Sequence, residues 1–296
     1  MTQNSINHFF KKYGAPYLFI SPFYILFAVF MVYPVINSLY LSFHQWNGST
    51  ERIYVGWENY INLIHDGVFI QSLINCVIIF FEYVPIMTFF AVVLAYILNM
   101  GKLKLQSFFR TSIFIPYITP VIAVGFVFSL LLDRDYGLVN LLLGYLGIKP
   151  VEWLLTPTLA RIAISVLVTW RWLGYNMIIM LAGLQSIPLE LYDAAKVDGA
   201  SGTQSFFRIT LPLMRPIILF ATVLSTIGTF SLFTEPLILT QGGGPMYSTL
   251  TPVLYLYSNA FQYLKFGYSS SIAYVYFIIL FILTRFEWRY FGSQAV

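Results

Sequence analysis

A single arginine, Arg171, stands in the middle of an apolar segment, between Trp170 and Trp172. An arginine at the centre of a membrane-spanning helix costs about 2.5–3.5 kcal/mol on insertion scales, so it is expected to face a cavity or a partner group rather than lipid. Glu82, in an earlier apolar segment, is a possible counter-ion. Two interpretations follow: Arg171 contacts a transported solute, or it forms a structural ion pair within a helix bundle.

A second set of polar side chains recurs at three- and four-residue steps in a later apolar segment, and comprises Thr222, Ser225, Thr226 and Thr229, followed by Phe233. This spacing places the hydroxyl groups on one face of a helix. Hydroxyls beside an aromatic ring would suit a sugar, because they offer hydrogen bonds and stacking. Packing between neighbouring helices explains the same stripe equally well.

The remaining chemistry-bearing residues predict neither a metal site nor an ATP site. His8, His44 and His65 are scattered, and Cys76 is the single cysteine, so no internal disulfide can form. The segment 242–245, Gly-Gly-Gly-Pro, lacks the Lys and Ser/Thr that follow the glycines of a P-loop, and it is better explained as a tight reversal. We therefore do not expect this chain to hydrolyse ATP itself.

Composition places these residues in a membrane protein, because 58% of the 296 residues are hydrophobic and 9% are charged. Soluble domains carry about 25% charged residues. A spanning helix needs about 20 mostly apolar residues, which predicts a single all-α transmembrane domain over residues 1–296. Its six spans are expected at about 16–43, 73–100, 108–132, 159–184, 213–239 and 270–288. The first run is too long for a cleaved signal peptide and has no small-residue cleavage site.

The distribution of Lys and Arg predicts the orientation. Basic residues concentrate on one side, at Lys11, Lys12, Lys102, Lys104, Arg110, Lys196, Arg208, Arg215, Arg285 and Arg289. That side is expected to be cytoplasmic, with both termini and the loop 187–212. The outer loops 44–72, 133–158 and 240–269 are rich in aromatic residues, which predicts either an interfacial aromatic belt or a docking surface for an extracytoplasmic partner.

The loop 187–212 has the pattern of a short helix, a turn and a second short helix. Pro188 suits a first helical turn, and Leu191, Ala194, Ala195 and Val197 are expected to form one small apolar face. Gly199 is expected where the chain reverses and a side chain would clash. The second helix is predicted over 202–209, before Pro212. Such a hairpin would either dock another protein closely or rest on lipid headgroups as an amphipathic linker.

The run Asp193-Ala194-Ala195, three further residues, Gly199 and a closing Leu211-Pro212 resembles the EAA loop of ABC importer permeases, the binding-protein-dependent transport inner-membrane component family. The segments 55–60, 136–140, 184–188, 207–216 and 240–245 are similar to the carbohydrate-uptake branch, with the maltose- and glycerol-phosphate-type permeases nearest. One position departs from the pattern, since Asp193 stands where the family has Glu and its side chain is one methylene shorter.

The resemblance implies a type I ABC importer permease with six transmembrane helices in a bacterial plasma membrane, working by alternating access. It implies that Asp193, Ala194, Ala195, Asp198 and Gly199 form a coupling helix seated in an ATPase. It places substrate contacts in the regions of Thr169, Arg171, Tyr175, Ser225 and Thr229.

The implied partners are a second homologous permease, two ABC ATPase subunits and an extracytoplasmic solute-binding protein, with no nucleic acid. ATP and Mg²⁺ are expected on the ATPases, and this chain is expected to bind no cofactor. A sugar or oligosaccharide is the expected solute, with glycerol phosphate or another small solute as the alternative. An ion-coupled secondary transporter is a further alternative, although we find no clear internal repeat of the kind those proteins show.

Overall fold

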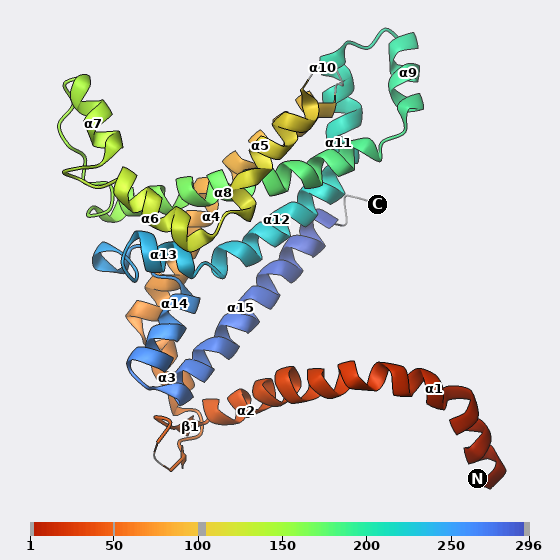
Figure 1. Cartoon of the computed structure of the whole chain (residues 1–296), viewed down its shortest axis with the longest axis vertical. Coiled ribbons are helices and arrows are strands. Elements are labelled where there is room, and N and C mark those ends of the chain that lie inside the picture. The colour runs from red at the N-terminus through yellow and green to blue at the C-terminus, as the bar shows by residue number, and fades with distance from the viewer. Residues whose placement is uncertain (1–2, 50, 100–104, 293–296) are drawn as a thin grey trace. The chain divides into compact units, whose positions relative to one another are not determined.

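The computed structural model describes residues 3–49, 51–99 and 105–292, so the predicted cytoplasmic Lys102 and Lys104 lie outside the described residues. The chain divides into two compact units, Met1–His65 with Ser258–Tyr274, and Asp66–Tyr257 with Val275–Val296. Helices dominate both units (Figure 1). The long helix α15, Phe266–Gly292, contributes its first turns to one unit and the rest to the other.

The first unit begins with a continuous helical rod made of α1 (Gln3–Phe27), a π turn (Ala28–Val32) and α2 (Tyr33–Ser42). A two-stranded antiparallel hairpin follows, in which β1 (His44–Gln45) pairs with β2 (Ile53–Tyr54), and then the short helix α3 (Glu58–Ile64). A π turn at Ser258–Gln262 precedes α15.

A buried asparagine ties this hairpin to the end of the rod. The amide of Asn59 donates to the carbonyl oxygens of Ser42 at 2.9 Å and His44 at 3.0 Å. Gly267, in the first turn of α15, lies so close to the hairpin that a Cβ there would be 1.8 Å from the His44 carbonyl oxygen. Only glycine therefore permits this contact between backbones.

The second unit is built around two long helices, α4 (Gly67–Asn99) and α8 (Pro157–Gln185), which pack along each other. The helix α12 (Arg215–Phe230) packs against both of them (Figure 1). Fully buried aliphatic and methionine side chains fill the interface between these helices in two clusters. One cluster surrounds Ile79, Met87 and Leu167, and the other surrounds Met177, Met180 and Met214. The second cluster lies beside the loop that carries the predicted coupling residues.

Shorter helices complete the second unit. They are α5 (Gln106–Ile118), α6 (Val121–Leu131), α7 (Leu138–Tyr145), α9 (Leu189–Val197), α10 (Gly202–Ser205), α11 (Leu211–Leu213), α13 (Thr234–Leu239) and α14 (Pro252–Tyr257). The helix α5 packs on α8 at Gly174, where a Cβ would lie 2.1 Å from the Ile113 carbonyl oxygen.

Four helical stretches of the described residues are long and apolar enough to cross a membrane: Pro16–Ser42, Gly67–Asn99, Pro157–Gln185 and Phe266–Arg289. Two bent pairs raise the number to six if each pair is one span. They are Gln106–Ile118 with Val121–Leu131, bent by 92°, and Gly202–Leu213 with Arg215–Phe230, bent by 60°. The first bend falls at Thr119 and Pro120, which have extended backbone and separate the two helices.

Three predicted helices differ from the structure. Residues 108–132 do not form one continuous helix, because α5 and α6 are separated at Thr119 and Pro120. Residues 213–239 do not form one helix, because α12 ends at Phe230 and α13 begins separately at Thr234. The second helix of the loop does not end before Pro212, because a π turn at Phe206–Thr210 leads into α11, Leu211–Leu213. The wider π turn comes just before Pro212, whose nitrogen has no proton to donate.

Candidate functional site

The helix α9 begins and ends at residues that the sequence marks out. Pro188 caps its start with an extended backbone conformation, Glu190 lies in the first turn and Lys196 lies in the last. A carboxylate near the amino end and a cation near the carboxyl end both complement the helix dipole. Local sequence therefore marks both ends of this helix.

Gly199 reverses the chain after α9 in a left-handed conformation, with φ +74°. The Gly199 amide donates to the Lys196 carbonyl at 3.0 Å, and the Ala200 amide donates to the Ala195 carbonyl at 2.8 Å. These two bonds form a Schellman motif, in which glycine is preferred because it has no Cβ. A Cβ at Gly199 would meet nothing within 4 Å, so the expectation of a clash was wrong and the requirement is the positive φ.

The chain then restarts a helix at Ser201 through a capping box. The Gln204 amide donates to the Ser201 hydroxyl oxygen at 3.2 Å, and the Ser201 amide donates to the Gln204 side-chain oxygen at 2.8 Å. Both ends of the reversal between α9 and α10 are thus closed by local hydrogen bonds, which holds the turn in one conformation.

One side of α9 is anchored to the rest of the second unit. Ala195 is buried, and the Tyr192 hydroxyl lies 2.8 Å from the Thr210 hydroxyl. Tyr192 also packs on the core cluster around Met177 and Met214. The helix is therefore attached to the spanning helices and not merely tethered by its ends.

The opposite side of α9, here called the α9 outer face, consists of the exposed residues Leu189, Asp193, Ala194 and Val197. The predicted small apolar face is thus divided, because Ala195 points inward while Ala194 and Val197 point outward. Asp193 forms an exposed ion pair with Lys196, with Oδ1 2.8 Å from Nζ. Exposed pairs of this kind contribute about 0.2–1 kcal/mol, so Asp193 is not needed for the fold.

Arg171 forms a buried ion pair, but with Glu235 and not with Glu82. Arg171 Nη1 lies 2.8 Å from Glu235 Oε1, and the two side chains are 12% and 8% exposed. Glu82 instead accepts a hydrogen bond from the Ser165 hydroxyl at 2.7 Å. The predicted counter-ion was wrong because the chain breaks after Phe230, which lets α13 place Glu235 in its first turn beside α8.

The helix α13 is held from a second direction as well. A Cβ on Gly125 of α6 would lie 2.9 Å from the Cγ2 of Ile238, so α6 and α13 are in close contact. The short α13 is therefore fixed between α6 and α8, by packing on one side and by charge on the other. Arg171 Nε is buried with no hydrogen-bond partner among the described residues, so the guanidinium has donor capacity that Glu235 does not use.

A cluster of three aromatic side chains lies about one helical turn beyond Arg171 on α8. Tyr175 stacks on Tyr117 with ring centroids 4.7 Å apart, and Trp172 packs edge-on against both, at 5.3 Å from Tyr117 and 5.7 Å from Tyr175. All three side chains are half-buried. The Thr169 hydroxyl donates to the Ser165 carbonyl at 2.7 Å, which satisfies it within its own helix.

The hydroxyl stripe of α12 faces α4. Thr229 is fully buried with its hydroxyl 2.7 Å from the Tyr83 hydroxyl, and Ser225 is buried with its carbonyl oxygen accepting from the same tyrosine at 3.3 Å. These are contacts of helix packing, the second interpretation that the sequence allowed. No hydrogen bond or ion pair within the described part of the chain joins Arg171 to Ser225 or Thr229.

The sequence reasoning missed Glu287. The Thr226 hydroxyl donates to Glu287 Oε1 at 2.6 Å, so a third side chain of the stripe joins α12 to α15. A carboxylate inside the apolar sixth segment was the available signal.

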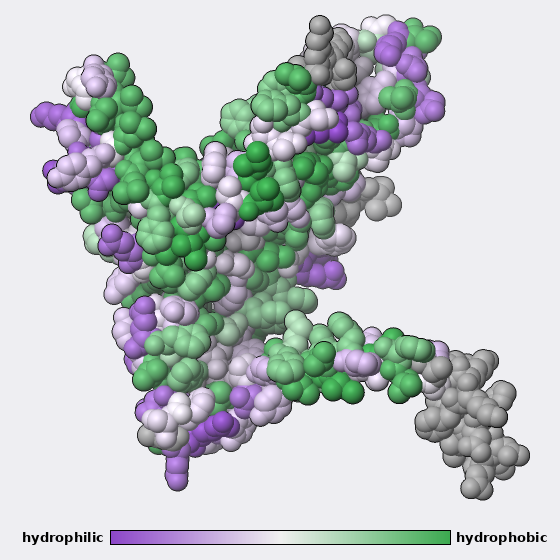
Figure 2. Space-filling view, viewed as in Figure 1, coloured by the Kyte–Doolittle hydropathy of each residue, from purple (hydrophilic) through white to green (hydrophobic). Residues whose placement is uncertain are grey.

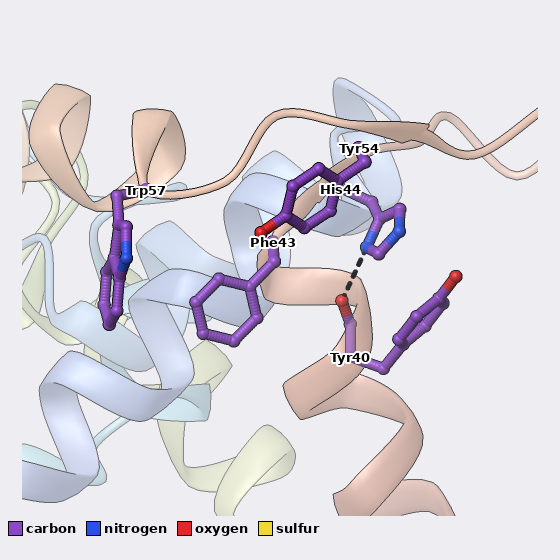
Figure 3. A pocket seen from close by; sticks show the side chains of 5 residues that line it. All are labelled: Tyr40, Phe43, His44, Tyr54 and Trp57. Atoms are coloured by element: carbon purple, nitrogen blue, oxygen red, sulfur yellow. Dashed lines mark hydrogen bonds between the residues drawn. The ribbon is translucent and has the colours of Figure 1, made fainter.

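The hairpin of the first unit carries an open aromatic pocket (Figure 3). His44 is buried in its wall, with Nδ1 2.7 Å from the Tyr40 carbonyl oxygen and its ring 4.1 Å from the Tyr40 ring. Tyr54 packs on His44 from β2, and Trp57 packs edge-on against Phe43. Tyr54 and Trp57 remain exposed. Within the described ranges, no group of three His, Cys, Asp or Glu side chains could hold a metal ion.

Comparison with known proteins identifies the family. Residues 87–287 match the family described as "Binding-protein-dependent transport system inner membrane component". The chain belongs to this family. It is a multi-pass membrane permease component of an ABC importer and not an enzyme, as the sequence predicted. The match includes α9, Gly199, Arg171 and Glu235.

Relatives of this inner-membrane component carry sugar-transport names. The chain is 40% identical over 288 residues to the lactose transport system permease protein LacF of Rhizobium radiobacter, covering 96% of this chain and 95% of that protein. It is 34% identical to the arabinooligosaccharides transport system permease protein AraP of Bacillus subtilis, covering 96% and 91%. It is 34% identical to the trehalose/maltose transport system permease protein MalF of Thermococcus litoralis, covering 90% of each chain.

The fold of the permease is that of a solved importer. A chain of a bacterial ABC transporter involved in the import of the acidic polysaccharide alginate superposes with a TM-score of 0.83 at 21% identity, covering 98% of this chain and 99% of that chain. A second structure, of the alginate transporter in complex with an alginate pentasaccharide-bound periplasmic protein, gives 0.79 at 22% identity, covering 94% of each chain. The predicted fold class, an all-α ABC importer permease, is therefore confirmed.

Proposed function

We propose that this permease imports a sugar or an oligosaccharide across a bacterial plasma membrane. The α9 outer face is the observation on which ATP-driven transport is proposed. This face is exposed, and its helix is held in place by the core and by the hydrogen bonds of the turn that follows it. A helix held in this way can transmit the movement of an ATPase without unfolding. The names of the relatives support the choice of solute, since lactose, arabinooligosaccharides and trehalose/maltose are all carbohydrates. Glycerol phosphate or another small solute is the alternative.

In this proposal α9 seats in a cleft of an ABC ATPase, and two ATPases bind the ATP and Mg²⁺ that drive the cycle. Asp193, Ala194 and Val197 meet the ATPase, while Asp198 and Gly199 shape the turn and Ala195 holds the helix to the body. Movement of α9 reaches the spanning helices through the Tyr192–Thr210 contact and the core that surrounds Met214. Both termini and this loop lie in the cytoplasm, in accord with the distribution of Lys and Arg.

The permease works beside a second, homologous permease, so that two chains enclose one path by alternating access. On this chain the most suitable substrate contacts lie on α8, where Tyr175 offers a half-buried ring beside Trp172 and Arg171 lies one turn away. Guanidinium donors and aromatic faces are groups that bind sugar hydroxyls and ring faces. Thr169 lies on the same helix. Ser225 and Thr229 are less suitable in this conformation, because α4 covers them.

The aromatic pocket around His44 is proposed as part of the docking surface for an extracytoplasmic solute-binding protein. It lies at the end of the first span, on the side opposite the amino terminus, and exposes Tyr54 and Trp57. Tyrosine and tryptophan are enriched among the few interface residues that contribute most of the binding energy. We expect Trp57→Ala to weaken the stimulation of ATPase activity by the binding protein and to leave basal ATPase activity unchanged. Tyr24→Ala, an exposed tyrosine within the first span and away from the hairpin, is the control.

A reconstituted transporter tests the proposal directly. The permease, its cognate permease, ATPase and binding protein are assembled in vesicles, and uptake of lactose, maltose, an arabinooligosaccharide and glycerol phosphate is measured with ATP or with an ion gradient. We expect uptake of at least one sugar that requires ATP and the binding protein. Uptake driven by an ion gradient without ATP would refute the mechanism, and ATP-driven uptake of glycerol phosphate alone would refute the choice of solute.

A further inference from the structure

The helix α7, Leu138–Tyr145, presents an uncovered apolar stripe. Leu138, Leu141, Leu142 and Tyr145 follow the spacing of one helix face, and their exposed fractions are 51%, 53%, 57% and 82%. Contiguous apolar surface of this kind on a folded protein marks a contact with a membrane or another protein. The stripe, here called the α7 stripe, belongs to no site described above.

A hydrogen-bond network fixes the direction in which the α7 stripe points. Asn140 lies on the opposite side of the helix and is buried. Its amide nitrogen donates to the carbonyl oxygens of Asp133, Arg134 and Val151 at 3.3, 3.0 and 2.9 Å. Its oxygen accepts from the Val151 amide at 3.0 Å and from Trp153 Nε1 at 3.1 Å. Rotation of α7 that would hide the leucines would break these bonds.

The apolar surface is continuous with that of α6, the second half of a bent spanning pair. Phe126, Val127 and Leu130 of α6 are exposed, and only the segment 132–137 separates α6 from α7. Figure 2 shows hydrophobic residues extending without interruption from the body of the second unit along one side of this arm. The exposed apolar surface of α6 therefore leads directly onto the α7 stripe.

Charged groups are confined to the two loops that flank α7. Asp133, Arg134 and Asp135 precede the helix, and Lys149 and Glu152 follow it. Arg134 and Glu152 join these loops in an ion pair, with Nη1 2.9 Å from Oε1. Within α7 itself, Tyr145 supplies the one polar tip on the stripe, and tyrosine is typical of the boundary between lipid and water.

We propose that α7 lies in the membrane interface as a lipid anchor, with the α7 stripe against acyl chains and the flanking charged loops among the headgroups. Anchoring helices of this kind bury their apolar face about 5–10 Å into the boundary between headgroups and acyl chains. The leaflet is the one opposite α9, because the spanning helix α8 separates α7 from α9.

Lipid fits the stripe better than a soluble binding protein does. A surface that docks and releases a soluble partner is about as polar as the rest of a protein surface and carries hydrogen-bonding groups at its rim. Three of the four stripe residues are leucines, which offer no hydrogen bonds. The anchor also holds α6, which packs through Gly125 on α13, the helix that carries Glu235.

Fluorescence quenching tests the depth of α7. Cys76 is fully buried, so single cysteines can be labelled with an environment-sensitive fluorophore against the native background. The label is placed at Leu142 in the stripe and, as controls, at Asp135 and Lys149 in the flanking loops. The full chain is reconstituted with its partner subunits in vesicles of phosphatidylcholine and phosphatidylglycerol. Part of the phosphatidylcholine is brominated near the carbonyl end of one acyl chain.

We expect the label at Leu142 to lose most of its emission to brominated lipid and to resist quenching by aqueous iodide, and the two control labels to behave in the opposite way. Quenching of the Leu142 label by iodide with no effect of bromine would place α7 in water and overturn the proposal. Resistance to both quenchers would show that protein covers the stripe, which also overturns it. None of these outcomes depends on which solute is transported.

Discussion

Arg171 of α8 and Glu235 of α13 are joined by an ion pair 2.8 Å long, and both side chains are almost completely buried. The pair connects a long spanning helix with a short helix that follows a break in the chain. Each buried charge loses its hydration, and the attraction between the two charges offsets that free-energy cost only while they remain paired. This relationship makes the pair sensitive to the loss of either member.

The first prediction concerns that sensitivity. Glu235→Leu or Arg171→Leu alone leaves one buried charge without its partner, which destabilises by about 3–5 kcal/mol. The double variant Arg171→Leu/Glu235→Leu removes both charges and should recover most of the lost stability. Thermal unfolding of the purified transporter, followed by exposure of buried cysteine to a thiol-reactive dye, gives the three values. A double variant as unstable as the sum of the single variants would show that the two side chains are not coupled.

A second prediction follows from the positive φ of Gly199. Gly199→Ala should strain the reversal by about 1–2 kcal/mol, because a left-handed conformation brings Cβ close to the following carbonyl oxygen. The strain loosens α9, so less ATPase should co-purify with the variant, and Gly199→Asp should do the same. Gly199→Asn should do less harm, since asparagine tolerates this conformation.

Gly202→Ala is the matched control for Gly199. A Cβ at Gly202 also meets nothing within 4 Å, but its φ is not positive. We expect this variant to retain the ATPase. Equal loss of the ATPase from Gly199→Ala and Gly202→Ala would show that the backbone conformation of the turn is not what matters.

Local sequence signals predicted the ends of α9 correctly, but they did not predict the partner of Arg171, and the difference has a physical reason. The start at Pro188, the charges in the first and last turns and the stop at Gly199 all act within a few residues, so the sequence alone indicates them. The partner of Arg171 depends on where α13 lies after the break that follows Phe230. The sequence analysis expected one helix over 213–239, and although Pro236 interrupts that run, it does not indicate where the chain breaks or which helix α13 meets.

The hydroxyl stripe illustrates a second limit. Periodicity predicts that Ser225 and Thr229 share a face, and they do. Periodicity does not say which helix that face meets. The Tyr83 hydroxyl comes from a segment more than a hundred residues away in the chain, and only tertiary structure brings it to Thr229.

A third prediction tests what those hydroxyl groups do. Thr229→Val and Tyr83→Phe each remove one member of a buried hydrogen bond, and each should lower stability by about 1–3 kcal/mol. The double variant should cost less than the sum, because no polar group is then left without its partner. Uptake assays that separate KM from kcat give the functional answer. An unchanged KM for the transported sugar is expected from a packing role, whereas a raised KM with unchanged stability would place Thr229 on the substrate path.

The last prediction concerns the carboxylate of Asp193, the position at which this chain departs from the family pattern. Asp193 is exposed, and its ion pair with Lys196 is of the kind that contributes little to stability. Asp193→Ala should therefore leave thermal stability unchanged and reduce the ATPase activity that the assembled transporter shows with its binding protein. Asp193→Glu should retain that activity if the ATPase tolerates a longer side chain, as the family pattern implies. Lys196→Ala breaks the same ion pair but keeps the carboxylate, so it separates the two roles of Asp193. Loss of coupling in Lys196→Ala equal to that in Asp193→Ala would show that the ion pair, and not contact between the carboxylate and the ATPase, is what coupling requires.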